Sequence, residues 1–157
     1  MTATAIAQLQ FMTAAEVCAA APLGAIIRYT DLAPEPPLRF KNKHAVWRRS
    51  NAQGRLISVT PGENGHPGHF TLHEGDFGTG KTVILTIRKT FALDSSLGFA
   101  IAQMPAPGSV AVLSAWNDIP ELQHLAANLR DAADWMRTNQ HHGAYLEPVL
   151  ACTQRAQ

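Results

Sequence analysis

Short runs rich in β-branched and aromatic residues, separated by turn-forming clusters, occupy residues 25–91. The run at 25–30 precedes the breaker APEPP at 33–37, and TVILTIRKTF at 82–91 follows a glycine-rich stretch. Valine, isoleucine and threonine have restricted side-chain torsions that favour strands. The segment therefore predicts a twisted antiparallel meander of four or five strands.

Two further patterns extend this prediction. The sequence LRFKNKHAVWRR at 38–49 alternates in residue type, and SNAQG at 50–54 separates it from RLISVT. This arrangement predicts a hairpin with a loop of about five residues. HFTLHE at 69–74 and SVAVLSAW at 109–116 are predicted strands, whereas residues 97–103 fit no single assignment.

Two segments carry helix signals. Thr13 followed by Glu16 has the spacing of a capping box and predicts a short helix over 13–21. Asp118, followed by a proline and a glutamate, resembles a second helix start. Apolar residues then recur at helical spacing, and they are Leu122, Leu125, Leu129, Ala132, Ala133 and Met136. We expect a helix over 118–138 that buries Leu122, Leu125, Leu129 and Met136.

The patterns together predict one α+β domain over residues 1–157. A twisted antiparallel β-sheet within residues 25–116 packs against the C-terminal amphipathic helix, with a short helix at 13–21 and a tail at 139–157. A chain of 157 residues that is 46% hydrophobic is long enough to close one core. In layout it resembles small single-strand-binding coactivator and Whirly-type domains.

Composition also limits the setting. No run of about 18 apolar residues occurs, so we expect no membrane span. Two cysteines far apart in a chain of this size predict a reduced, cytoplasmic protein without disulfides. No nucleophile-elbow sequence such as G-x-S-x-G is present, and no catalytic residue is assigned.

Residues 75–82 fit the Walker A pattern G-x-x-x-x-G-K-[ST]. In a phosphate loop, Gly75 and Gly80 would let backbone N–H groups wrap the phosphates, Lys81 would reach their terminal oxygens, and Thr82 would hold Mg²⁺. Such a loop opens a helix at once, because the helix N-terminus forms part of the anion site. The β-branched residues after Thr82 instead favour a hairpin connection. Nucleotide binding, with ATP and Mg²⁺ as cofactors and ATPase activity, is retained as an alternative.

Basic residues are unevenly distributed along the chain. Ten of the thirteen lie between residues 28 and 89, where only five acids occur. If residues 38–49 form a strand, one face carries four cations and an indole. That face comprises Arg39, Lys41, Lys43, Trp47 and Arg49. With Arg28 and Arg88 added, it predicts a surface for single-stranded DNA or RNA, because cations follow phosphates and an indole stacks on bases.

Two other hypotheses come from different classes. His66, His69 and His73 lie beside acids, but Pro67 and Gly68 interrupt them and strand spacing separates them, so no metal site is expected. An apolar face on the predicted C-terminal helix would suit a protein-interaction or assembly module. That module would dock a partner or a second copy of the chain, giving a homo-oligomer.

Overall fold

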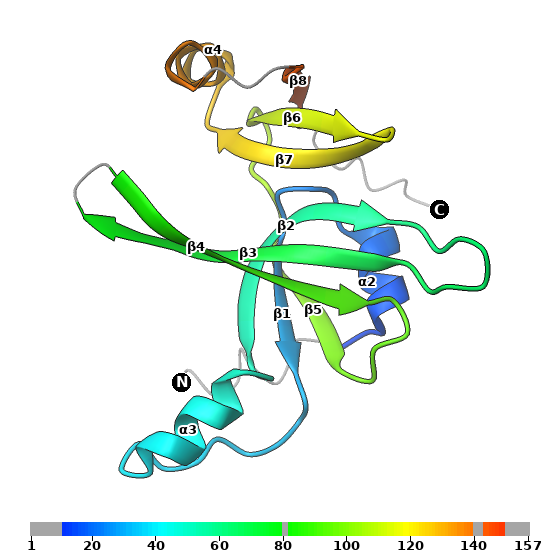
Figure 1. Ribbon diagram of the computed structural model, residues 1–157, viewed down its shortest axis with the longest axis vertical. Helices are drawn as coiled ribbons and strands as arrows, with labels where there is room; N and C mark the ends of the chain where they lie inside the picture. The colour runs from blue at the N-terminus through cyan, green and yellow to red at the C-terminus, as the bar shows by residue number, and fades with distance from the viewer. Residues whose placement is uncertain (1–10, 80–81, 140–142, 150–157) are drawn as a thin grey trace.

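The computed structural model describes residues 11–79, 82–139 and 143–149. These residues form a curled antiparallel half-barrel sheet of eight strands with three helices (Figure 1). In chain order the elements are α2 (Ala14–Ala20), β1 (Ile26–Thr30), α3 (Lys41–Arg48), β2 (Ala52–Thr60), β3 (His69–Thr79), β4 (Thr82–Ala92), β5 (Gly98–Gln103), β6 (Val110–Trp116), β7 (Ile119–Ala126), α4 (Leu129–Thr138) and β8 (Tyr145–Pro148). The α+β class predicted from sequence is confirmed.

The first helix follows its sequence signals closely. The Thr13 hydroxyl accepts a hydrogen bond from the Glu16 N–H at 3.2 Å, which satisfies one of the free donors of the first turn. Ala14 and Val17 are buried against the sheet. The helix ends at Ala20, ahead of Pro22. The short helix predicted over 13–21 is therefore confirmed to within a residue at each end.

The main core lies inside the half-barrel formed by β5, β1, β2, β3 and β4. Each of four different strands contributes one aromatic ring, and the rings are Tyr29, Phe70, Phe91 and Phe99. Their paired centroids lie 4.7 to 5.4 Å apart, in tilted, stacked and edge-to-face contacts. The Tyr29 hydroxyl donates to the Glu74 carboxylate, so the polar end of this buried ring has a partner. This cluster ties together strands that are distant in sequence.

The sheet divides at β2. One edge of β2 pairs with β3, and the other pairs with β1 over residues 52–55. Further along that second edge, Ser58 pairs with Glu121 of β7. Strand β3 pairs with β2 as far as His73 and continues beyond it against β4 alone. The β3–β4 hairpin and the β7–β6–β8 part of the sheet therefore separate from each other beyond this point (Figure 1).

The helix predicted over 118–138 is wrong in its first half. Asn117 and Asp118 have φ values of 51° and 64° and form a tight turn between β6 and β7. Such left-handed turns suit a two-residue hairpin connection, and asparagine and aspartate tolerate them. The helix starts only after Asn128, whose side chain accepts from the Asp131 N–H at 2.9 Å.

The burial predicted for the apolar residues of segment 118–138 is confirmed only in part. Leu122 is buried on β7, Leu125 is half-buried on the same strand, and Met136 is half-buried on α4. Leu129 is 63% exposed, which contradicts the prediction. The apolar side of α4 packs within its own chain, and this contact comprises Ala132, Trp135 and Met136 against Val110, Val112 and Ala126.

The strand predicted over 38–49 is also wrong, because these residues form α3. His44 and Trp47, three residues apart on the helix, turn toward the preceding loop. His44 is buried and its Nε2 lies 2.8 Å from the Glu35 carboxylate. The Trp47 indole N–H donates to the Ala33 carbonyl at 2.9 Å. The hairpin expected across residues 50–54 is consequently absent, and β2 begins at Ala52.

Two smaller outcomes complete the fold. Residues 98–103, which fitted no single assignment, form β5. Strand β8 lies within the predicted tail and pairs with β6. Across the described ranges, no helix is long and apolar enough to cross a membrane.

Candidate functional site

The most basic feature of the molecule is the segment 38–49, here called the cationic arm. It contains Arg39, Lys41, Lys43, Arg48 and Arg49 and no acidic residue. All five cations are exposed, and none forms an ion pair within the described part of the chain. Helix α3 projects from the sheet at the end of the molecule opposite α4 (Figure 1). The arm therefore presents unneutralised positive charge to solvent.

The base of the arm is firmly held. Besides the His44 and Trp47 contacts, the Asn51 amide donates to the Asp31 carboxylate and to the Trp47 carbonyl, each at 2.9 Å. The Lys89 ammonium of β4 donates to the Arg49 carbonyl. These bonds attach the middle and the C-terminal end of α3 to the preceding loop and to β4.

Helical geometry changes the predicted surface. Successive helix residues turn by about 100°, so the five residues assigned to one strand face spread around α3. Trp47 is half-buried and its ring lies 5.5 Å from that of His44, so it anchors the helix. Phe40 is the aromatic ring that the arm exposes, at 41%. The strand pattern placed Phe40 on the opposite face, and for that reason Phe40 is absent from the predicted surface.

Phe40 lies between two cations. The Arg39 guanidinium is 4.9 Å and the Lys43 ammonium 5.2 Å from its ring centroid. Phe40 is also the N-cap residue of α3, and it provides no side-chain cap. Lys41 and Lys43 occupy the first turn, where the helix dipole favours anions and disfavours cations. This end of α3 therefore combines free N–H groups, positive charge and an exposed ring.

Two other predicted residues lie away from the arm. Arg28 is half-buried in the middle of β1, opposite Gln53 and Ala100. Arg88 lies on β4, where its guanidinium donates to the Glu121 carboxylate of β7 at 2.8 Å. The structure does not bring either residue to the cationic arm.

The Walker A match falls on the β3–β4 hairpin. Strand β3 continues to Thr79 and β4 begins at Thr82, with Thr79 opposite Thr82 and Gly78 opposite Val83. Gly80 and Lys81 lie outside the described residues. The predicted hairpin between these strands is confirmed, but Gly75–Thr79 belong to β3 and not to its loop. A phosphate loop needs a helix where β4 runs, and residues 82–92 form a strand instead.

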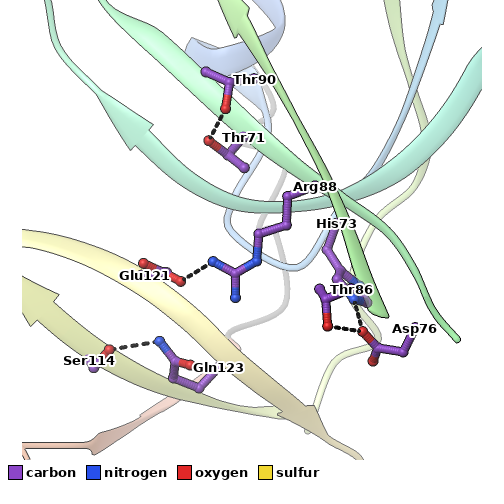
Figure 2. Close-up of polar contacts among 9 residues, drawn as sticks. All are labelled: Thr71, His73, Asp76, Thr86, Arg88, Thr90, Ser114, Glu121 and Gln123. Atoms are coloured by element: carbon purple, nitrogen blue, oxygen red, sulfur yellow. Dashed lines mark hydrogen bonds and ion pairs between the residues drawn. The ribbon is translucent and has the colours of Figure 1, made fainter. Parts of the chain in front are cut away.

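A polar cavity of about 420 Å³ lies where the sheet divides, and we call it the fork cavity. Its lining comes from β2, β3, β4 and β7 and comprises Arg55, Ile57, His73, Asp76, Thr86, Arg88, Leu122, Gln123, His124 and Leu125. Figure 2 shows Arg88 reaching from β4 to Glu121, while His73 and Thr86 converge on Asp76 at 2.8 and 2.9 Å. The described residues contain no cluster of potential metal ligands.

A larger hollow of about 820 Å³ lies between the C-terminal end of α2 and strands β6 and β8. Alanine, proline, leucine, methionine and valine make up nearly all of its lining, and Glu147 is its one charged side chain. This hollow provides no positively charged group for a phosphate. Of these two cavities, only the fork cavity is lined by basic side chains.

The carboxylate in the fork cavity gives a testable pH effect. The hydrogen bond from His73 lowers the pKa of Asp76. The hydrogen bond from Thr86 and the positive charge of Arg88 lower this pKa further. Ionised Asp76 therefore stabilises the fold above its unfolded-state pKa, and this contribution disappears as pH falls through the lower folded-state pKa. We expect His73→Ala to raise the pKa of Asp76, as measured by NMR titration of its carboxyl carbon.

Asp31 provides the control for that titration. The Ala33 backbone N–H and the Asn51 side chain lower its pKa, and neither is part of the fork cavity. The pKa of Asp31 should be the same in wild type and in His73→Ala. An unchanged Asp76 pKa in the variant would show that the His73 contact does not control this carboxylate.

These features define a class: a small α+β protein in which a curled antiparallel half-barrel carries a protruding basic helix. Residues 12–153 match the family model described as uncharacterised conserved protein UCP036055, and the chain belongs to this family. No curated protein and no solved structure matches the chain.

Proposed function

We propose that the protein binds single-stranded nucleic acid, DNA or RNA, through the cationic arm. The observation that supports this is the set of five exposed cations in a segment that carries no acid and whose helix is held at its middle and C-terminal end. Cations that contact phosphates release condensed counterions, which is the main source of sequence-independent affinity. Because the arm is already ordered, little of that affinity is lost in arranging it.

A single strand suits the arm better than a duplex. Phe40 is exposed, and Arg39 and Lys43 lie over its ring, so a base that displaces one of these flexible side chains stacks on the ring with its phosphates close to both cations. Stacking on an aromatic side chain contributes about 1–3 kcal/mol per base and needs an unpaired base. The proposal thus keeps the chemistry expected from the sequence but moves it from a sheet face to a helix. We also propose that the protein acts in the cytoplasm, since nucleic acid is available there.

The salt dependence of binding tests the proposal. For a labelled single-stranded oligonucleotide, the slope of log affinity against log salt is about −0.7 for each phosphate contact. Five contacts would lower affinity by about 100-fold between about 50 and 200 mM salt. Fluorescence anisotropy over this range measures the slope. A lack of binding at about 50 mM salt, or a slope near zero, would refute the proposal.

Two variants locate the binding. Phe40→Ala should weaken single-strand binding by about 1–3 kcal/mol while leaving the salt slope nearly unchanged, because stacking releases no counterions. Arg130→Glu with Arg137→Glu reverses two cations on α4, at the opposite end of the molecule (Figure 1). This control should bind nearly as well as wild type. Equal losses in it and in arm variants would indicate only a general charge effect.

A further inference from the structure

The fork cavity is separate from the cationic arm and carries its own chemistry. Arg55 and His73 are the final residue pair between β2 and β3, and the cavity opens directly beyond this pair. Arg88 bridges the gap to β7 through Glu121. The cavity therefore results from the division of the sheet, and strands from both branches supply its polar side chains.

Both arginines retain unused hydrogen-bond donors. A guanidinium has five N–H groups. Arg88 places one on Glu121, and Arg55 places one on the Gly24 carbonyl at 2.7 Å. Because the partner of Arg55 is a neutral carbonyl, the charge of Arg55 is not balanced by that contact. The two carboxylates in or beside the cavity already have partners: Asp76 accepts from His73 and Thr86, and Glu121 accepts from Arg88.

His124 adds a third nitrogen-bearing side chain. Its ring stacks on Trp135 with centroids 5.2 Å apart and an interplanar angle of 3°, which fixes its plane. Burial lowers the pKa of His124, the charge of nearby Arg55 lowers it further, and Asp131 opposes both. The neutral imidazole that results has one N–H donor.

From this arrangement we infer that the fork cavity binds a small oxyanion, a phosphate or a carboxylate, between Arg55, Arg88 and His124. Guanidinium forks match the paired oxygens of both groups. The volume of about 420 Å³ lies within the range of small-molecule sites and exceeds that of a bare phosphate ion. A phosphomonoester or a short dicarboxylate is therefore the class of ligand that suits it.

Calorimetric titration of the full chain with inorganic phosphate, and separately with malonate, tests the inference at constant ionic strength. Binding of phosphate alone identifies a phosphate site, and binding of malonate identifies a carboxylate site. Arg88→Gln and Arg55→Gln should each raise the Kd for the bound anion by at least about tenfold, since each removes charged hydrogen bonds. Two arginine variants are used because either one could disturb the fold, which circular dichroism checks.

Arg48→Gln on the cationic arm is the matched control and should leave the Kd for the anion unchanged. The inference fails if neither anion binds wild type more strongly than chloride does. It also fails if folded Arg88→Gln and Arg55→Gln bind the anion as well as wild type. These outcomes are independent of the oligonucleotide experiment, which depends on the cationic arm.

Discussion

Replacing Lys41 and Lys43 together by glutamate is expected to weaken single-strand binding by about 100-fold at about 50 mM salt. Each phosphate contact contributes a little under one decade of affinity at this salt concentration, and the variant loses two such contacts. The new carboxylates also repel phosphates, and the salt slope should become shallower by about 1.4. Fluorescence anisotropy at several salt concentrations measures both the affinity and the slope.

A loss of binding in this variant cannot be explained by unfolding of α3. Positions 41 and 43 lie in the first turn, where the helix dipole favours acidic side chains over the native lysines. The helix should therefore be at least as stable as in wild type, which far-UV circular dichroism checks. Lys41→Gln with Lys43→Gln should give an intermediate loss. If the glutamate variant binds within about threefold of wild type, phosphate contact by Lys41 and Lys43 is ruled out.

Strands β1 to β4, strand β6 and the first helix could be predicted because their signals are local. Thr13 and Glu16 cap α2 as their spacing indicates. The β-branched run after Thr82 forms β4, although a Walker A match precedes it. In both cases the preferences of neighbouring residues decide the structure, and distant parts of the chain do not change it.

The cationic arm could not be predicted from alternation alone. Its basic and apolar residues alternate like a strand, yet Phe40, His44 and Trp47 also have the spacing of a helix. Glu35 and Ala33 select the helix, because they accept hydrogen bonds from His44 and Trp47 across the preceding loop. These partners lie nine and fourteen residues away, beyond the reach of a periodicity argument.

Strand β7 shows how a bulge can imitate a helix. Its register against β6 shifts between Val112 and Leu113, which leaves Gln123 as an extra residue. Side chains normally alternate across a strand, but an extra residue reverses the alternation. Leu122 and Leu125, three residues apart, consequently contact the same apolar cluster. Their spacing therefore resembles that of one helical face.

The fork cavity could not be predicted for a different reason: its lining comes from four strands whose pairing no local pattern specifies.

Phe99→Ala is expected to lower the free energy of unfolding by about 3–5 kcal/mol, the usual cost of deleting a buried aromatic ring. Phe99 is fully buried, and its ring makes edge-to-face contacts with Phe70 at 5.2 Å and Phe91 at 5.4 Å. Because these rings belong to β5, β3 and β4, the cavity left by the substitution would lie between strands that close the half-barrel. Urea unfolding followed by tryptophan fluorescence measures the loss.

Leu38→Ala provides the control for this substitution, since Leu38 is 72% exposed and its truncation should change stability by no more than about 0.5 kcal/mol. The backbone of Phe99 also exchanges hydrogen bonds with Met12, at 2.6 and 2.9 Å, and alanine preserves both. The measured loss therefore reports the ring and not the pairing of the chain. If Phe99→Ala costs less than about 1 kcal/mol, the four rings do not form the core that holds the strands of the half-barrel together.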